Sequence, residues 1–158
     1  NGPDGRVLFV AEAVAGGGAS QVNGTEYLAP GTYPFFCQIH GPSMKGDLTI
    51  NPVGSAVPRP SVGVSFANQR LRQVRKAGVR GKTRAATASS GVLISARKGK
   101  ALLGVKRGIN LKAGQTRTLT IPLTKAGRKA IRKGKVVRIS LRAEVRFGKP
   151  SNAVRKVR

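Results

Sequence analysis

Apolar and polar residues alternate along most of the C-terminal two thirds of this chain. The longest run covers residues 137–147, where an apolar side chain stands at every second position. Because successive side chains of a strand point to opposite faces of a sheet, this period predicts strands with one buried face. The apolar positions that share a face are Val62, Val64 and Phe66; Val92, Ile94 and Ala96; Leu119, Ile121 and Leu123; and Val137, Ile139, Leu141, Ala143, Val145 and Phe147.

Short turns rich in glycine and basic residues separate these segments. Several short antiparallel strands with turns between them are typical of a β-sandwich, and we expect an immunoglobulin-like sandwich of about seven strands over residues 61–158. One short helix is predicted within it, capped by Thr124, running through Lys133 and closed by Gly134. Gly127 disfavours that helix, because glycine has a low helix propensity.

The first 50 residues have a less regular pattern. An apolar strand is predicted over residues 6–12, and residues 21–28 lead to a Pro-Gly turn. Two strand-like segments, residues 27–36 and 45–50, flank a loop that contains a Gly-Pro pair. We therefore expect about four strands in this part of the chain. The predicted fold class of the whole chain is all-β.

Charge divides the chain into two regions. The first 50 residues carry two basic and four acidic side chains, whereas the remainder carries 28 basic side chains and one acidic side chain, Glu144. Between them lies a segment with three prolines, a glycine and a serine, a composition typical of a stiff linker. The predicted organisation is a first domain over residues 1–51, a linker over residues 52–60 and a basic β-sandwich domain over residues 61–158.

The only cysteine, the only histidine and the only methionine of the chain lie within eight residues, as Cys37, His40 and Met44. A thiolate, an imidazole and a thioether are the ligands of electron-transfer copper sites, in which two His and one Cys form a trigonal set with a long axial Met. Separately, each residue has a simpler interpretation, as a buried thiol, a surface imidazole or a core methionine. Together, they predict a copper site.

The segment from Tyr27 to Ile50 resembles the C-terminal ligand loop of the cupredoxins, the type 1 (blue) copper proteins related to plastocyanin and amicyanin. The resemblance is carried by Gly-Thr-Tyr-x-Phe-x-Cys-x-x-His, which begins at Gly31, and by the Met-x-Gly that follows. It implies that Cys37 is an equatorial thiolate, His40 an equatorial imidazole and Met44 the weak axial ligand of one copper ion.

The resemblance also implies a partial cupredoxin Greek-key sandwich over residues 1–51. A complete cupredoxin has more strands, so we expect an uncovered sheet edge and core face here. The family requires a second equatorial His from an earlier strand, and we expect this residue upstream of Asn1, because the sequence holds only one histidine.

These features predict an exported or envelope-attached copper protein that carries single electrons to and from a redox partner protein. An enzyme is not expected, because the sequence offers no nucleophile–base pair and no carboxylate pair. Two alternatives stay open. One is a protein that sequesters or delivers Cu(I), and the other is a structural module that binds the cell wall and carries a vestigial copper loop.

The basic domain loosely resembles accessory β-sandwich domains on surface proteins of high-GC Gram-positive bacteria, through the Leu-Thr-Lys-Ala-Gly-Arg-Lys-Ala sequence that begins at Leu123. Its charge predicts attraction to polyanions. Two interpretations stay open: attachment to an anionic cell wall or membrane surface, and a solvated basic face that has no dedicated partner. Specific nucleic-acid recognition is not expected, because Phe66 and Phe147 are the only aromatic residues in this region and no DNA- or RNA-binding motif occurs.

Overall fold

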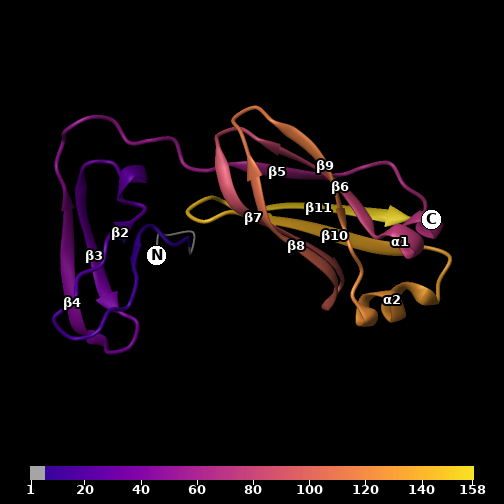
Figure 1. The fold of residues 1–158 in the computed structure, drawn as a ribbon, viewed down its shortest axis with the longest axis horizontal. Helices are drawn as coiled ribbons and strands as arrows, with labels where there is room; N and C mark the ends of the chain where they lie inside the picture. The colour runs from indigo at the N-terminus through magenta and orange to yellow at the C-terminus, as the bar shows by residue number, and fades with distance from the viewer. Residues whose placement is uncertain (1–5) are drawn as a thin grey trace. The chain divides into compact units, whose positions relative to one another are not determined.

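The computed structural model describes residues 6–158 (Figure 1). The chain divides into two compact units, Asn1–Pro58 and Arg59–Arg158. The division falls inside the proline-rich segment that the sequence predicts as a linker, and residues 51–58 are all exposed to solvent. Within the described residues, no helix is long and apolar enough to cross a membrane.

The second unit contains seven strands in two antiparallel sheets. One sheet has the strand order β11-β10-β7-β8 and the other has the order β5-β6-β9. The strands are β5 (Val62–Phe66), β6 (Val79–Ala85), β7 (Ser89–Lys98), β8 (Ala101–Leu111), β9 (Thr116–Ile121), β10 (Val137–Glu144) and β11 (Ser151–Val157).

A single aliphatic core lies between these two sheets. Alternate residues of β10 are buried, so that Ile139 and Leu141 have no exposed surface, and Ile94 on β7 and Ile121 on β9 meet them in the same cluster. The all-β class predicted from the alternation is confirmed for the described residues. Burial of this many aliphatic side chains is the main source of stability in the second unit.

Two helices accompany the strands, where the sequence predicts one. The predicted helix is α2 (Lys125–Arg132), and the hydroxyl of its N-cap Thr124 accepts a hydrogen bond from the Gly127 amide at 2.9 Å. The expectation of a single helix was wrong, because α1 (Leu71–Ala77) precedes β6 and buries Leu71 and Val74.

Gly127 has a packing role that explains its place inside α2. A Cβ atom at this position would collide with the carbonyl oxygen of Leu103 and lie 2.7 Å from the Leu103 Cα. The missing side chain therefore lets the α2 backbone approach β8, and the low helix propensity of glycine is offset by this close packing.

The predicted strand over residues 137–147 is too long. β10 ends at Glu144, and Phe147 follows in a turn with a φ of 62°. The Phe147 side chain is nevertheless buried. The alternating pattern therefore predicts its burial correctly but not its secondary structure. Leu123 likewise lies beyond the end of β9 at Ile121.

The described residues of the first unit form four strands, two of them minimal. The strand predicted over residues 6–12 is only β1 (Val10–Ala11), which pairs with β2 (Val22–Asn23). The 3-10 helix η1 (Thr25–Tyr27) follows β2. A longer antiparallel hairpin is formed by β3 (Gly31–Cys37) and β4 (Gly41–Ile50).

This unit has almost no core. Leu28 is the only buried hydrophobic side chain among its described residues, whereas Phe35 and Phe36 on β3 are 45% and 61% exposed. The ring of Phe9 packs edge-on against Tyr33 and Phe35, with centroids 6.5 and 6.4 Å apart. Phe35 and Phe36 are therefore largely open to solvent, and the uncovered core face of a partial cupredoxin stays a prediction.

Candidate metal centre

The turn between β3 and β4 carries the residues that the sequence predicts as copper ligands. The turn itself comprises residues 38–40, and β4 begins at Gly41 rather than at Lys45 as the sequence predicts. The register shifts at this point, since Phe36 pairs with Lys45 but Cys37 pairs with Gly41. Residues 42–44 therefore form a bulge in β4 beside the end of β3.

The structure brings Cys37 and His40 together. The Cys37 Sγ atom lies 3.3 Å from the His40 Nδ1 atom, within hydrogen-bonding distance for sulfur. The turn is fixed by the Ser43 hydroxyl, which donates to the His40 carbonyl oxygen at 2.6 Å. Gly41 has a φ of 61°, a left-handed conformation that glycine adopts without strain.

Met44 lies in the adjacent bulge. Its side chain is 58% exposed, and that of Ile39 at the tip of the turn is 76% exposed. Cys37 is half-buried and His40 is exposed. The thiol and the imidazole thus form a pair at the end of the hairpin, and the thioether stands in the same bulged end with its side chain open to solvent.

The donor set fits part of a copper site. Thiolate and imidazole bonds to transition metals are about 2.0–2.3 Å long, so two atoms 3.3 Å apart can both bind one ion. No group of three or more His, Cys, Asp and Glu residues gathers within the described part of the chain. The expected second equatorial His would lie upstream of Asn1, outside the described residues.

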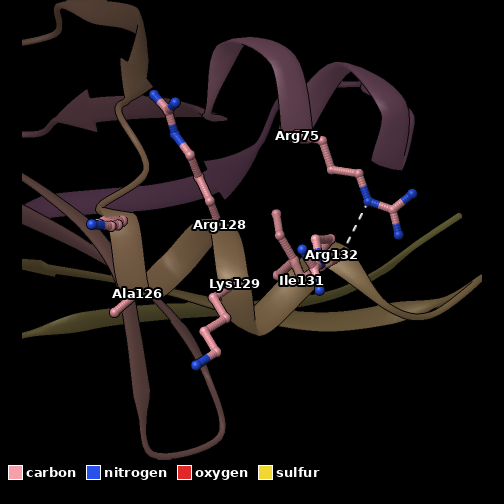
Figure 2. Close-up of a pocket in the computed structure, with 7 residues that line it drawn as sticks. Arg75, Ala126, Arg128, Lys129, Ile131 and Arg132 are labelled. Atoms are coloured by element: carbon pink, nitrogen blue, oxygen red, sulfur yellow. Dashed lines mark hydrogen bonds between the residues drawn. The ribbon is translucent and has the colours of Figure 1, made fainter.

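The second unit contains a basic hollow that sequence reasoning did not single out. It lies at α2, has a volume of about 760 Å³ and is lined by five basic residues, with Ala126 and Ile131 as its apolar members (Figure 2). The basic lining residues are Arg75, Lys125, Arg128, Lys129 and Arg132.

Arg75 has a structural role in this hollow. Its guanidinium donates from Nε to the Ile131 carbonyl at 3.0 Å and from a terminal nitrogen to the Gly134 carbonyl at 2.7 Å. Lys98 similarly donates to the Ala130 carbonyl at 2.8 Å. The Ala130 and Ile131 carbonyl groups belong to the last turn of α2, which leaves them without helical partners, and the Gly134 carbonyl lies just beyond the helix.

No family model matches this sequence, and no curated protein or solved structure matches it at a significant level.

Proposed function

We propose that this chain is a copper protein of the type 1 class that carries single electrons. The observation that carries this proposal is the 3.3 Å separation between the Cys37 Sγ and the His40 Nδ1 in a bulged β-hairpin end. Met44 in the neighbouring bulge adds a third soft donor. When bound, copper supplies exchange of one electron between the Cu(I) and Cu(II) states.

Each residue has a separate role in this proposal. Cys37 provides a thiolate from a half-buried position at the end of β3, where the ladder to β4 fixes its backbone. His40 provides an imidazole whose exposed edge is open to a redox partner protein. Met44 stands as the weak axial donor, which tunes the potential without being needed for the short bonds.

We also propose a more specific fold for each of the two units. We assign the first unit to a partial cupredoxin Greek key, and the β3–β4 ligand hairpin supports this. We assign the second unit to the immunoglobulin-like class. β5, β6 and β9, the first, second and fifth of the seven strands, share one sheet. β7, β10 and β11, the third, sixth and seventh, share the other sheet, and this division is the one found in the immunoglobulin-like class. The fourth strand, β8, pairs with the third.

We place the protein outside the cell or in the cell envelope, with the basic unit against an anionic wall or membrane surface. The support is the charge of this unit, in which Glu144 is the sole acidic residue and contacts Arg142 at 2.8 Å. In this proposal no substrate is transformed, so the chain is not an enzyme.

Visible absorption with Cu(II) tests the copper proposal on the whole chain. Free imidazole added to the sample takes the place of the second equatorial His. We expect an intense band from the short thiolate–Cu(II) bond with imidazole present, and a weak or transient one without it, because an open site favours oxidation of the thiolate. A colourless sample whose thiol remains free and reduced contradicts the electron-carrier function.

Three variants assign the ligands in the same experiment. Cys37→Ser is expected to abolish the band, and His40→Ala to raise the concentration of imidazole that the colour requires. Met44→Leu is expected to keep the band, since an axial thioether contributes little to the equatorial bonds. Since Met44 lies in the same bulged end of the hairpin, a band retained in Met44→Leu attributes the losses in the other two variants to the equatorial donors.

A Cu(I) sequestration or delivery function is the alternative that one observation favours. The imidazole of His40 and the thioether of Met44 are both exposed, so the three donors can reach an incoming ion without any movement of a covering layer. This alternative predicts tight Cu(I) binding through the same three residues but no stable blue Cu(II) form at any imidazole concentration. The remaining alternative, a wall-binding module with a vestigial copper loop, predicts no tight Cu(I) binding and no blue Cu(II) form.

A further inference from the structure

The outer face of β6 carries a row of three cations. Residues 79–85 alternate strictly between buried and exposed positions, and the exposed ones are Arg80, Lys82 and Arg84. Since a strand advances about 3.3 Å per residue, neighbouring cations in the row are roughly 6.6 Å apart at the backbone. β6 is the central strand of the sheet β5-β6-β9, so the row runs along the middle of an open sheet face.

The strands on both sides place small residues next to this row. The register sets Lys82 and Arg84 between short side chains of β5 and β9, which leaves the long cationic side chains without bulky neighbours. Three of the flanking residues also carry hydroxyl groups that can donate hydrogen bonds. The flanking exposed positions are Gly63 and Ser65 on β5 and Thr116 and Thr118 on β9.

No carboxylate in this unit is available to neutralise the row. Its only acidic residue, Glu144, lies on β10 in the other sheet and contacts Arg142. Three like charges in a line repel one another, and an anion chain with repeated charges relieves that repulsion. Release of counterions from such a chain adds further binding free energy.

The cations of α2 are arranged differently. Figure 2 shows Arg128 and Lys129 extending to opposite sides of the helix, and Arg75 turned toward the Ile131 carbonyl. A linear ligand cannot follow side chains that diverge in this way. α2 therefore carries four cations, Lys125, Arg128, Lys129 and Arg132, without the linear order of the β6 row.

We propose that the outer face of β5-β6-β9 binds a linear phosphodiester polymer that lacks bases, with Arg80, Lys82 and Arg84 contacting successive phosphate groups. Arg suits phosphate because its guanidinium can donate two parallel hydrogen bonds. The face has no aromatic side chain among its outward residues, so it offers no surface on which a base could stack. A single row of cations fits a chain better than it fits a flat bilayer.

This inference deepens the proposed attachment to an anionic surface and is independent of the copper loop. It is tested with the whole chain, without copper, against poly(glycerol phosphate) at several salt concentrations. The row variant is Arg80→Gln/Lys82→Gln/Arg84→Gln. The matched control is Lys125→Gln/Arg128→Gln/Lys129→Gln, which removes the same number of charges from α2.

We expect the row variant to bind at least about tenfold more weakly than the α2 variant at equal salt. The slope of log affinity against log salt should fall in magnitude by about 2 for the row variant, since each lost phosphate contact removes roughly 0.7. Equal losses from the two variants overturn the inference, because binding then follows net charge alone. If the triple variant does not fold, Lys82→Gln by itself should lower the slope by about 0.7 while Lys129→Gln leaves it unchanged.

Two further ligands distinguish the source of the phosphates. A single-stranded oligonucleotide with the same number of phosphates is expected to bind no more tightly than poly(glycerol phosphate), with no preference between base sequences. Vesicles containing phosphatidylglycerol are expected to lose similar affinity with either triple variant. Tighter, sequence-dependent binding of the oligonucleotide overturns the inference in favour of nucleic acid, and a selective loss of vesicle binding in the row variant overturns it in favour of a membrane.

Discussion

Two hairpins of this protein, β7–β8 and β3–β4, pair over comparable lengths but have different surroundings. In the second unit, β7 and β8 present Val92, Ile94 and Leu103 to a facing sheet, and all three are fully buried. In the first unit, β3 and β4 pair over a comparable length, yet neither strand contains a buried residue. Backbone pairing therefore forms a hairpin in both units, but side chains are buried only where a second sheet covers the hairpin.

The hydrophobic core lies in the second unit, whereas the candidate metal ligands lie in the first unit. A two-stranded hairpin without a covering layer is marginal in water, and the first unit has one buried hydrophobic side chain among its described residues. The ligands Cys37 and His40 lie at the end of that hairpin. Because a metal that binds the ordered form stabilises it by mass action, we expect copper binding and order in the hairpin to be coupled.

Amide hydrogen exchange on the whole chain should give the largest contrast between the units. β10 is bonded on both sides, by β7 and β11, and its inward side chains are fully buried. Amides of Ile139 and Leu141 are expected to exchange at least about 1,000-fold more slowly, relative to their random-coil rates, than those of Phe35 and Lys45. Comparable protection in β3–β4 would show that the hairpin has stability that its burial does not account for.

Matched truncations should show the same contrast in equilibrium stability. Ile139→Ala removes a fully buried side chain and is expected to lower the free energy of unfolding of the second unit by about 2–5 kcal/mol. Phe36→Ala removes a larger side chain that is 61% exposed, and its effect should stay within about 0.5 kcal/mol. Urea unfolding followed by circular dichroism measures both. A large loss from Phe36→Ala would reveal a packed face on β3.

A smaller effect is expected from a methyl group added inside the second unit. Gly127→Ala raises helix propensity, yet its Cβ meets the Leu103 backbone, so we expect a net loss of about 1–3 kcal/mol. Gly63→Ala is the control, since its Cβ meets only the Arg84 carbonyl oxygen at 3.8 Å. Thermal unfolding should show a lower midpoint for Gly127→Ala alone. An unchanged or raised midpoint would mean that α2 shifts away from β8 without cost.

Hydrophobic periodicity predicted the strands whose inward positions are all apolar. β10 was visible in the sequence for this reason, whereas β6 turns Gly81 and Thr83 toward the core and has no such signal. α1 was missed because it has only two buried apolar residues and no Ser, Thr, Asp or Asn cap. Its N-cap is Arg70, whose amide donates to the Gln73 side chain at 2.7 Å.

The sequence predicted which residues form the candidate site, but not the backbone geometry that positions them. Spacing placed Cys37 and His40 in one turn, and the structure brings their side chains to 3.3 Å. The bulge at residues 42–44 depends on the pairing of Phe36 with Lys45 and of Cys37 with Gly41, which no single segment encodes. The cation row of β6 was also out of reach, because it needs both the strand assignment and the identity of its neighbours in the sheet.

X-ray absorption of the whole chain loaded with one equivalent of Cu(I) tests the central claim most directly, that Cys37 and His40 bind the same ion. We expect a first shell with sulfur at about 2.3 Å and at least one imidazole nitrogen at about 2.0 Å. Cys37→Ser should remove the short sulfur contribution, and His40→Ala should reduce the imidazole scattering. A first shell made only of light atoms in the unaltered chain, or one that Cys37→Ser leaves unchanged, would contradict the assignment of this hairpin end as a copper site.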